Sequence, residues 1–161
     1  MPVTLMLASA AITLALVFYT FGVFSERKSG HLSGAHVALF WCGLAFDTTG
    51  TTFMTAMAHE SAGSASATHG ITGAVAIVLM LVHALWATLT WLRRDGHREQ
   101  TFHRFSTLVW LLWLIPYLSG VMVGVPFITL GDTASILVSA GIVVLLALVL
   151  NRPRSRRVVA G

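Results

Sequence analysis

Five long apolar segments occupy most of this chain of 161 residues, and they constrain its fold more than any other feature. They cover residues 2–24, 35–58, 70–92, 105–125 and 132–150. About 20 apolar residues form a helix that crosses a hydrocarbon core of roughly 30 Å, and each segment is close to that length. The segments are continuous, whereas a membrane β-barrel would alternate polar and apolar residues. We therefore expect an all-α membrane protein in which residues 1–161 form a single domain, a bundle of five transmembrane helices.

The placement of the basic residues predicts the orientation of these helices. Only 10% of the residues are charged, whereas about a quarter would be charged in a soluble domain. All ten Lys and Arg residues follow the first, third or fifth segment: Arg27, Lys28, Arg93, Arg94, Arg98, Arg104, Arg152, Arg154, Arg156 and Arg157. With five spans, these positions share one side of the membrane, and the positive-inside rule makes that side cytoplasmic. We expect the N-terminus outside and the C-terminus inside a bacterial cytoplasmic membrane.

Composition also narrows the class of partner. The net charge of +4 follows from this topology and suits contact with anionic lipid, and nothing resembles a nucleic-acid surface. The single cysteine, Cys42, excludes an internal disulfide and a thiolate-rich zinc or iron–sulfur site. The first segment lacks the positively charged start of a signal peptide, so we expect it to be retained as a span.

The third segment contains an ionisable residue at depth. His83 lies ten residues before Arg93, about 15 Å along a helix axis at 1.5 Å per residue. A titratable group near mid-membrane is costly and indicates a functional site. His69 lies fourteen residues earlier, close to the same helical face.

The second segment carries a polar face. At 100° per residue, the following residues fall within about 40° of His36: Phe40, Gly43, Asp47, Gly50 and Met54. Glycines on an inward face either let a neighbouring helix approach closely or leave room for a flat ligand, and close helix packing is the more common reason. An aspartate this deep must be paired, protonated or directed into a cavity.

The fourth segment has a similar face below His103. It carries Ser106, Thr107, Trp110, Leu114, Tyr117 and Val121. We expect Trp110, Trp113 and Trp86 of the third segment to line the interior, because they lie away from the interfacial positions that tryptophan often occupies.

His36, His83 and His103 lie on three consecutive segments, and we expect their rings to converge in the cytoplasmic half of the bundle. Such a set suits b-type haem, which two axial histidines can hold while Arg93, Arg94 and Arg104 bind its propionates. It also suits a divalent metal with Asp47 as a further ligand. A hydrogen bond between His83 and Asp47, expected at a similar depth, would fix the imidazole tautomer, with or without a bound ligand.

Four motifs resemble one known family. FDTTGTTFM (46–54), HGITG (69–73), LMLVHALWA (79–87) and FHRFSTLVWLLWLIPYLSG (102–120) are similar to the small bacterial HsmA-type membrane proteins, the haem-sequestering family. The resemblance covers about half of the chain. It implies a five-helix protein that holds haem, limits oxidative stress, and uses His36, His69, His83 and His103 as the histidines of the site.

The leading interpretation is therefore a protein that sequesters or buffers haem b. The preferred axial pair is His83 with His36, which the motifs around His83 favour, and His103 then contacts a propionate or serves as the alternative sixth ligand. The depth of the side chains favours His36 with His103 instead, and the sequence leaves this choice open. The alternatives are a quinone-linked cytochrome b-like electron carrier and a proton- or metal-coupled transporter built on Asp47 and His83. No nucleophile–base pair or phosphate-binding loop is present in the sequence, so enzyme chemistry by side chains alone is not indicated.

Overall fold

The computed structural model describes residues 3–60, 67–93, 96–124 and 130–152, with side chains for 3–57, 70–93, 99–123 and 130–152. Each described range is helical over nearly its whole length. The five helices are α1 (Val3–Ser29), α2 (Gly34–Glu60), α3 (Ala67–Arg93), α4 (Gly96–Gly124) and α5 (Asp132–Leu150). The expected all-α class is confirmed.

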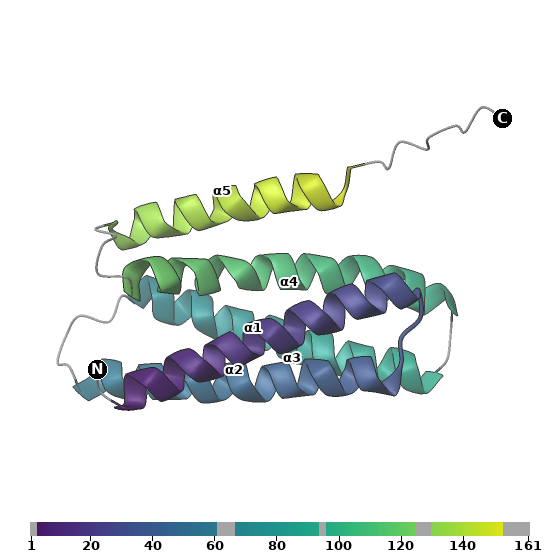
Figure 1. Ribbon diagram of the computed structural model, residues 1–161, viewed down its shortest axis with the longest axis horizontal. Coiled ribbons are helices and arrows are strands. Elements are labelled where there is room, and N and C mark those ends of the chain that lie inside the picture. Colours follow the sequence, from purple (N-terminus) through teal and green to yellow (C-terminus); the bar gives the residue numbers. More distant parts are fainter. Residues whose placement is uncertain (1–2, 61–66, 94–95, 125–129, 153–161) are drawn as a thin grey trace.

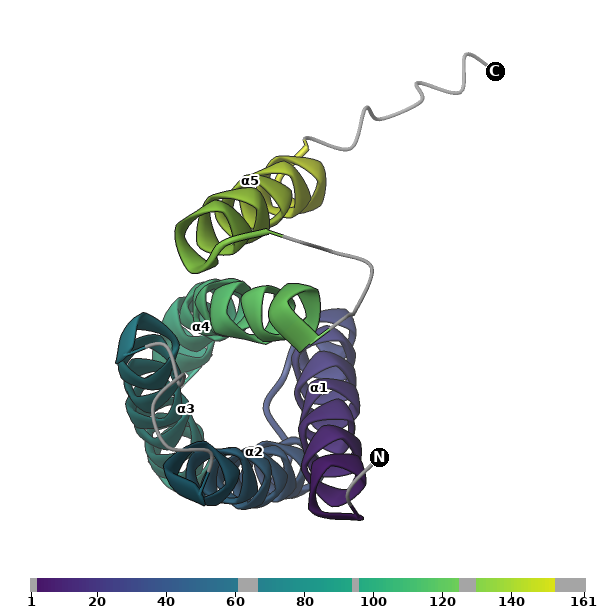
Figure 2. The same ribbon diagram turned by 90° about the vertical axis from the view of Figure 1, so that its left-hand side faces the viewer.

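The first four helices enclose a common core, and α5 lies outside it. Viewed from one end, α1, α2, α3 and α4 form a ring in which each helix packs on its two neighbours (Figure 2). α1 and α2 form the most extensive pairing of the bundle. α5 packs on the outer side of α4, with its axis running roughly along the bundle (Figure 1).

Four of the described helices, α1, α3, α4 and α5, are long and apolar enough to cross a membrane. α2 is as long as α1 and α3, at 27 residues, but the middle of the helix contains a run of mostly polar residues from Asp47 to Thr55. Several of these are threonines whose hydroxyls donate to carbonyls four residues earlier: Thr48 to Leu44, Thr49 to Ala45, Thr52 to Thr48 and Thr55 to Thr51. Such bonds satisfy the hydroxyl within the helix itself.

Two helices, α1 and α4, extend furthest beyond the apolar segments that predicted them. α1 continues to Ser29, five residues past residue 24, and ends at Gly30, whose φ of 69° is a left-handed conformation that glycine adopts at a helix end. The Gly30 amide donates to the Glu26 carbonyl. α4 starts at Gly96, nine residues before the expected residue 105. Hydrophobicity predicted only the apolar part of each helix. Polar residues with a high helix propensity extend the helices beyond that part.

The predicted inward face of α2 is confirmed, and its glycines serve helix packing. His36, Phe40, Gly43, Asp47 and Gly50 are all buried. A Cβ at Gly43 would lie 2.5 Å from the Tyr19 ring, and one at Gly50 would lie 2.6 Å from the Ile12 side chain. Side chains of α1 therefore fill the space that these glycines leave, so the described packing supports close helix approach and not an open slot for a flat ligand.

Candidate functional site

His83 is fully buried in the core and surrounded by aromatic rings. Its ring stacks nearly parallel on Phe102, with centroids 5.2 Å apart, and meets the Phe40 ring edge-on at 4.4 Å. Its Nε2 lies 3.0 Å from the Ser106 hydroxyl of α4. Nδ1 has no hydrogen-bond partner among the described residues. When Nε2–H donates to Ser106, the lone pair of Nδ1 is left free, which is the state a metal ligand requires.

His103 is held at both ring nitrogens. Nδ1 is hydrogen-bonded to the Glu26 carboxyl of α1, and Nε2 lies 3.3 Å from the Gly30 carbonyl. A carbonyl only accepts, so Nε2 of His103 must carry a hydrogen and donate it. Glu26 is fully buried, and its second carboxyl oxygen has no partner in the described part of the chain. This pair fastens the end of α1 to α4.

His36 has a fixed tautomer. Its Nδ1 accepts the Ser33 backbone N–H at 3.1 Å, just before α2 begins. A neutral ring with an accepting Nδ1 carries its hydrogen on Nε2, so neither nitrogen offers a free lone pair. The His31 ring lies 6.4 Å away.

The three histidines thus occupy the same end of the bundle but have separate partners. In the described ranges, no group of three or more His, Cys, Asp or Glu residues could hold a metal ion. The expectation of a single ligand set formed by His36, His83 and His103 is therefore not met by this arrangement. His83 is bonded to Ser106 of α4 and His103 to Glu26 of α1, whereas His36 is bonded to Ser33 just before its own helix.

Asp47 lies deeper than His83, which corrects the expectation of a similar depth. The Trp113 indole N–H donates to the Asp47 carboxyl at 2.9 Å, whereas His83 meets Ser106. Trp113 and Ser106 are seven residues apart on α4, about 10 Å at 1.5 Å per residue. The expected His83–Asp47 hydrogen bond is replaced by these two contacts, because the packing of α2 and α3 places Phe40 beside His83.

The other predicted site residues are dispersed around this core. Trp110 is buried and donates to Thr20, Tyr117 stacks on Trp113, and half-buried Trp86 packs on Phe105. Arg93, the last residue of α3, and Arg104, next to His103 on α4, are exposed. The side chain of His69 lies outside the described residues, as does Arg94.

Sequence reasoning missed Glu26, Ser106 and Tyr19 as partners of the polar core. Glu26 gave one usable signal: it is the only acidic residue among the first 30, and it lies seven residues after Tyr19 on one helical face. Arg27 and Lys28 follow it directly, and such a charged run is typical of a solvated helix end. Its actual partner, His103, lies 77 positions further along the chain.

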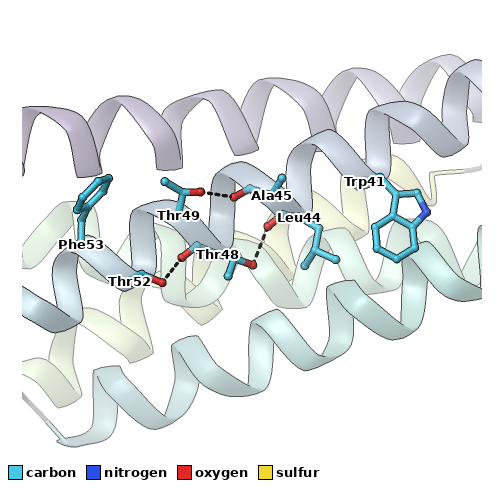
Figure 3. A pocket seen from close by; sticks show the side chains of 7 residues that line it. All are labelled: Trp41, Leu44, Ala45, Thr48, Thr49, Thr52 and Phe53. Carbon is cyan, nitrogen blue, oxygen red and sulfur yellow. Dashed lines mark hydrogen bonds between the residues drawn. The ribbon is translucent and has the colours of Figure 1, made fainter.

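A hollow of about 500 Å³ lies along α2, and most of the residues that line it are exposed (Figure 3). It is lined by Trp41, Leu44, Ala45, Thr48, Thr49, Thr52 and Phe53. Trp41 donates to Thr88 of α3 across its edge. The threonine hydroxyls at this hollow bond to their own helix, so they present mainly methyl groups to a neighbour.

Comparison of the chain with known protein families, curated proteins and solved structures finds no match.

Proposed function

We propose that the protein is a multi-pass protein of a bacterial cytoplasmic membrane with all five helices as spans. α2 supports this because its threonine hydroxyls are bonded within the helix, and because it packs between α1 and α3, which are both apolar enough to cross. Five crossings also leave every Lys and Arg on one side, with the N-terminus outside and the C-terminus inside.

We further propose that this protein binds b-type haem, and that His83 is the protein ligand of the iron. The observation that carries this proposal is the fully buried imidazole of His83 with an unpartnered Nδ1 among aromatic side chains. A nitrogen lone pair in an apolar, aromatic environment suits an iron porphyrin, which is apolar apart from its propionates.

The arrangement fits one protein histidine on the iron better than two. The hydrogen bonds of His36 and His103 leave no free lone pair on either ring, so neither residue meets the requirement for an axial ligand as it is arranged. Phe40 and Phe102 pack on the His83 ring, so these side chains would have to move aside for His83 to hold a porphyrin iron. Exposed Arg93 and Arg104 carry the positive charge that propionates would meet.

Bound haem would supply an iron centre, and its retention in the bundle would keep it from reacting with peroxide elsewhere. The chain's own residues exclude water from His83, orient its ring through Ser106, and hold the cytoplasmic end of the bundle together through Glu26 and His103. This supports storage or buffering of haem, in keeping with the resemblance of the motifs to haem-sequestering proteins.

The test is the haem content of purified protein from haem-replete cells, read from oxidised and reduced absorption spectra. We expect His83→Ala to lose most of the haem, His36→Ala to keep it, and His97→Ala to match the unsubstituted chain. Equal haem content in the His83→Ala and His97→Ala proteins, or a colourless unsubstituted protein, would contradict the proposal. Quinone-dependent turnover of the haem would favour electron transfer instead of storage.

A further inference from the structure

A second buried polar cluster surrounds Asp47, away from His83. Asp47 is 4% exposed and lies thirteen residues after Gly34, about 20 Å along α2 from its first residue. The Trp113 indole donates to one carboxyl oxygen at 2.9 Å. An ionised carboxylate offers about four lone-pair sites, so one donor leaves most of its hydrogen-bonding capacity unused.

Tyr19 of α1 belongs to the same cluster. Its ring meets Trp113 edge-on at 5.1 Å, and it packs on Gly43, one helical turn before Asp47. The Tyr19 side chain is fully buried, and its hydroxyl has no partner in the described part of the chain. The hydroxyl is within electrostatic range of the Asp47 carboxyl. A phenol can both donate and accept a hydrogen bond, so it can serve a carboxyl group in either protonation state.

Nothing described near Asp47 neutralises its charge. The ion pair found among the described residues joins Glu26 to His103 at the end of the bundle. A lone carboxylate inside a membrane protein is strongly disfavoured, so such groups pair, protonate or bind a cation. The packing is tight here, since a Cβ at Gly43 would already lie 2.5 Å from the Tyr19 ring. Little space remains for a metal ion or an organic cation, and the smallest neutralising ligand is a proton.

We propose that Asp47 is a proton-binding site within the membrane, which takes up and releases a proton, with the neighbouring Tyr19 hydroxyl available as a second hydrogen-bond partner beside Trp113. This hydroxyl has no partner among the described residues, and it can donate to the carboxylate or accept from the carboxylic acid. The other titratable groups on the elements around it are His83 on α3 and Tyr117 on α4, and Tyr117 stacks on Trp113. The site uses none of the proposed haem ligands and does not depend on haem.

The test is pH-dependent infrared difference spectroscopy of the full-length protein in membrane vesicles. A protonated carboxylic acid has a C=O stretching band that the carboxylate lacks, and the method requires no reagent to enter the packed core. We expect a carboxylic acid band, assigned to Asp47 by its absence from Asp47→Asn, that decreases as the pH rises from about 5 to about 9.

Three variants separate a proton site from a merely structural residue. Asp47→Asn should lose the band, whereas Asp132→Asn, at the exposed first residue of α5, should keep it with the same pH profile. Tyr19→Phe removes a hydroxyl that can donate to the carboxylate, which favours the acid and should move the midpoint of the profile up by about one pH unit. The unsubstituted chain and Tyr19→Phe suffice should Asp47→Asn fail to fold. Absence of a carboxylic acid band at every pH, or a band that stays constant across the range, would overturn the proposal.

Discussion

Substitution of Gly43 by alanine tests whether the fit of α1 against α2 sets the architecture. The new Cβ would lie 2.5 Å from two carbon atoms of the Tyr19 ring, whereas real Cβ contacts do not fall below 3.0 Å. The ring would have to move by about 1 Å to reach ordinary van der Waals contact near 3.5 Å. Tyr19 is fully buried with Trp113 against it, so the shift is resisted, and overpacking of this kind costs about 1–3 kcal/mol.

A matched control removes the effect of helix propensity, because alanine is a better helix former than glycine by about 1 kcal/mol. Gly141 lies in the middle of α5, is exposed, and has nothing within 4 Å of the position of a Cβ. The difference in free energy of unfolding between Gly43→Ala and Gly141→Ala should therefore be the packing cost alone, about 1–3 kcal/mol. Denaturant unfolding in detergent, followed by tryptophan fluorescence, measures it. A Gly43→Ala protein as stable as Gly141→Ala would refute the argument.

Three further substitutions follow from the same contacts, each measured by unfolding in detergent. Glu26→Gln should destabilise the protein by about 1.5–3 kcal/mol, because it weakens a charge-assisted hydrogen bond to His103. The control, Glu99→Gln at a partly exposed position, should change the stability little. Equal effects of the two substitutions would contradict a specific interaction between Glu26 and His103. Gly30→Ala should lower the free energy of unfolding by about 1–2 kcal/mol, because the φ of 69° strains any residue with a Cβ. Gly131→Ala, at a φ of −67°, is the control. A Gly30→Ala protein of unchanged stability would show that the turn relaxes. Trp41→Phe should lose about 0.5–1.5 kcal/mol with its hydrogen bond to Thr88, and no loss would mean that this surface contact contributes nothing.

Local patterns predicted what each helix buries. Hydrophobic length placed all five helices, and the spacing of Phe40, Gly43 and Asp47 from His36 predicted the face of α2 that the structure buries. These properties depend on residues three or four apart in one helix, so the sequence carries them directly.

The pairing between helices could not be obtained in this way. The depth of one helix against another depends on side chains that interlock across the interface, such as the Phe40 ring beside Gly22 and the Tyr19 ring on Gly43. That interlocking places His83 level with Ser106 and Phe40, and Asp47 level with Trp113. Counting residues from the end of an apolar segment predicts the depth of a residue along its own helix only. It does not include the shift of one helix along its neighbour.

The position of α5 has a consequence for assembly during synthesis. The ring closes when α4 meets α1, and α5 is made after all four of its members. The residues of the polar core around Glu26, His83 and Asp47 are thus all synthesised before α5, so the core can form without it. α5 then joins as a lateral addition against α4, with the Arg27 guanidinium donating to the Leu150 carbonyl at its far end. A tag or partner domain fused after α5 would lie at the periphery of the bundle. It would therefore not disturb the packing of α1 to α4.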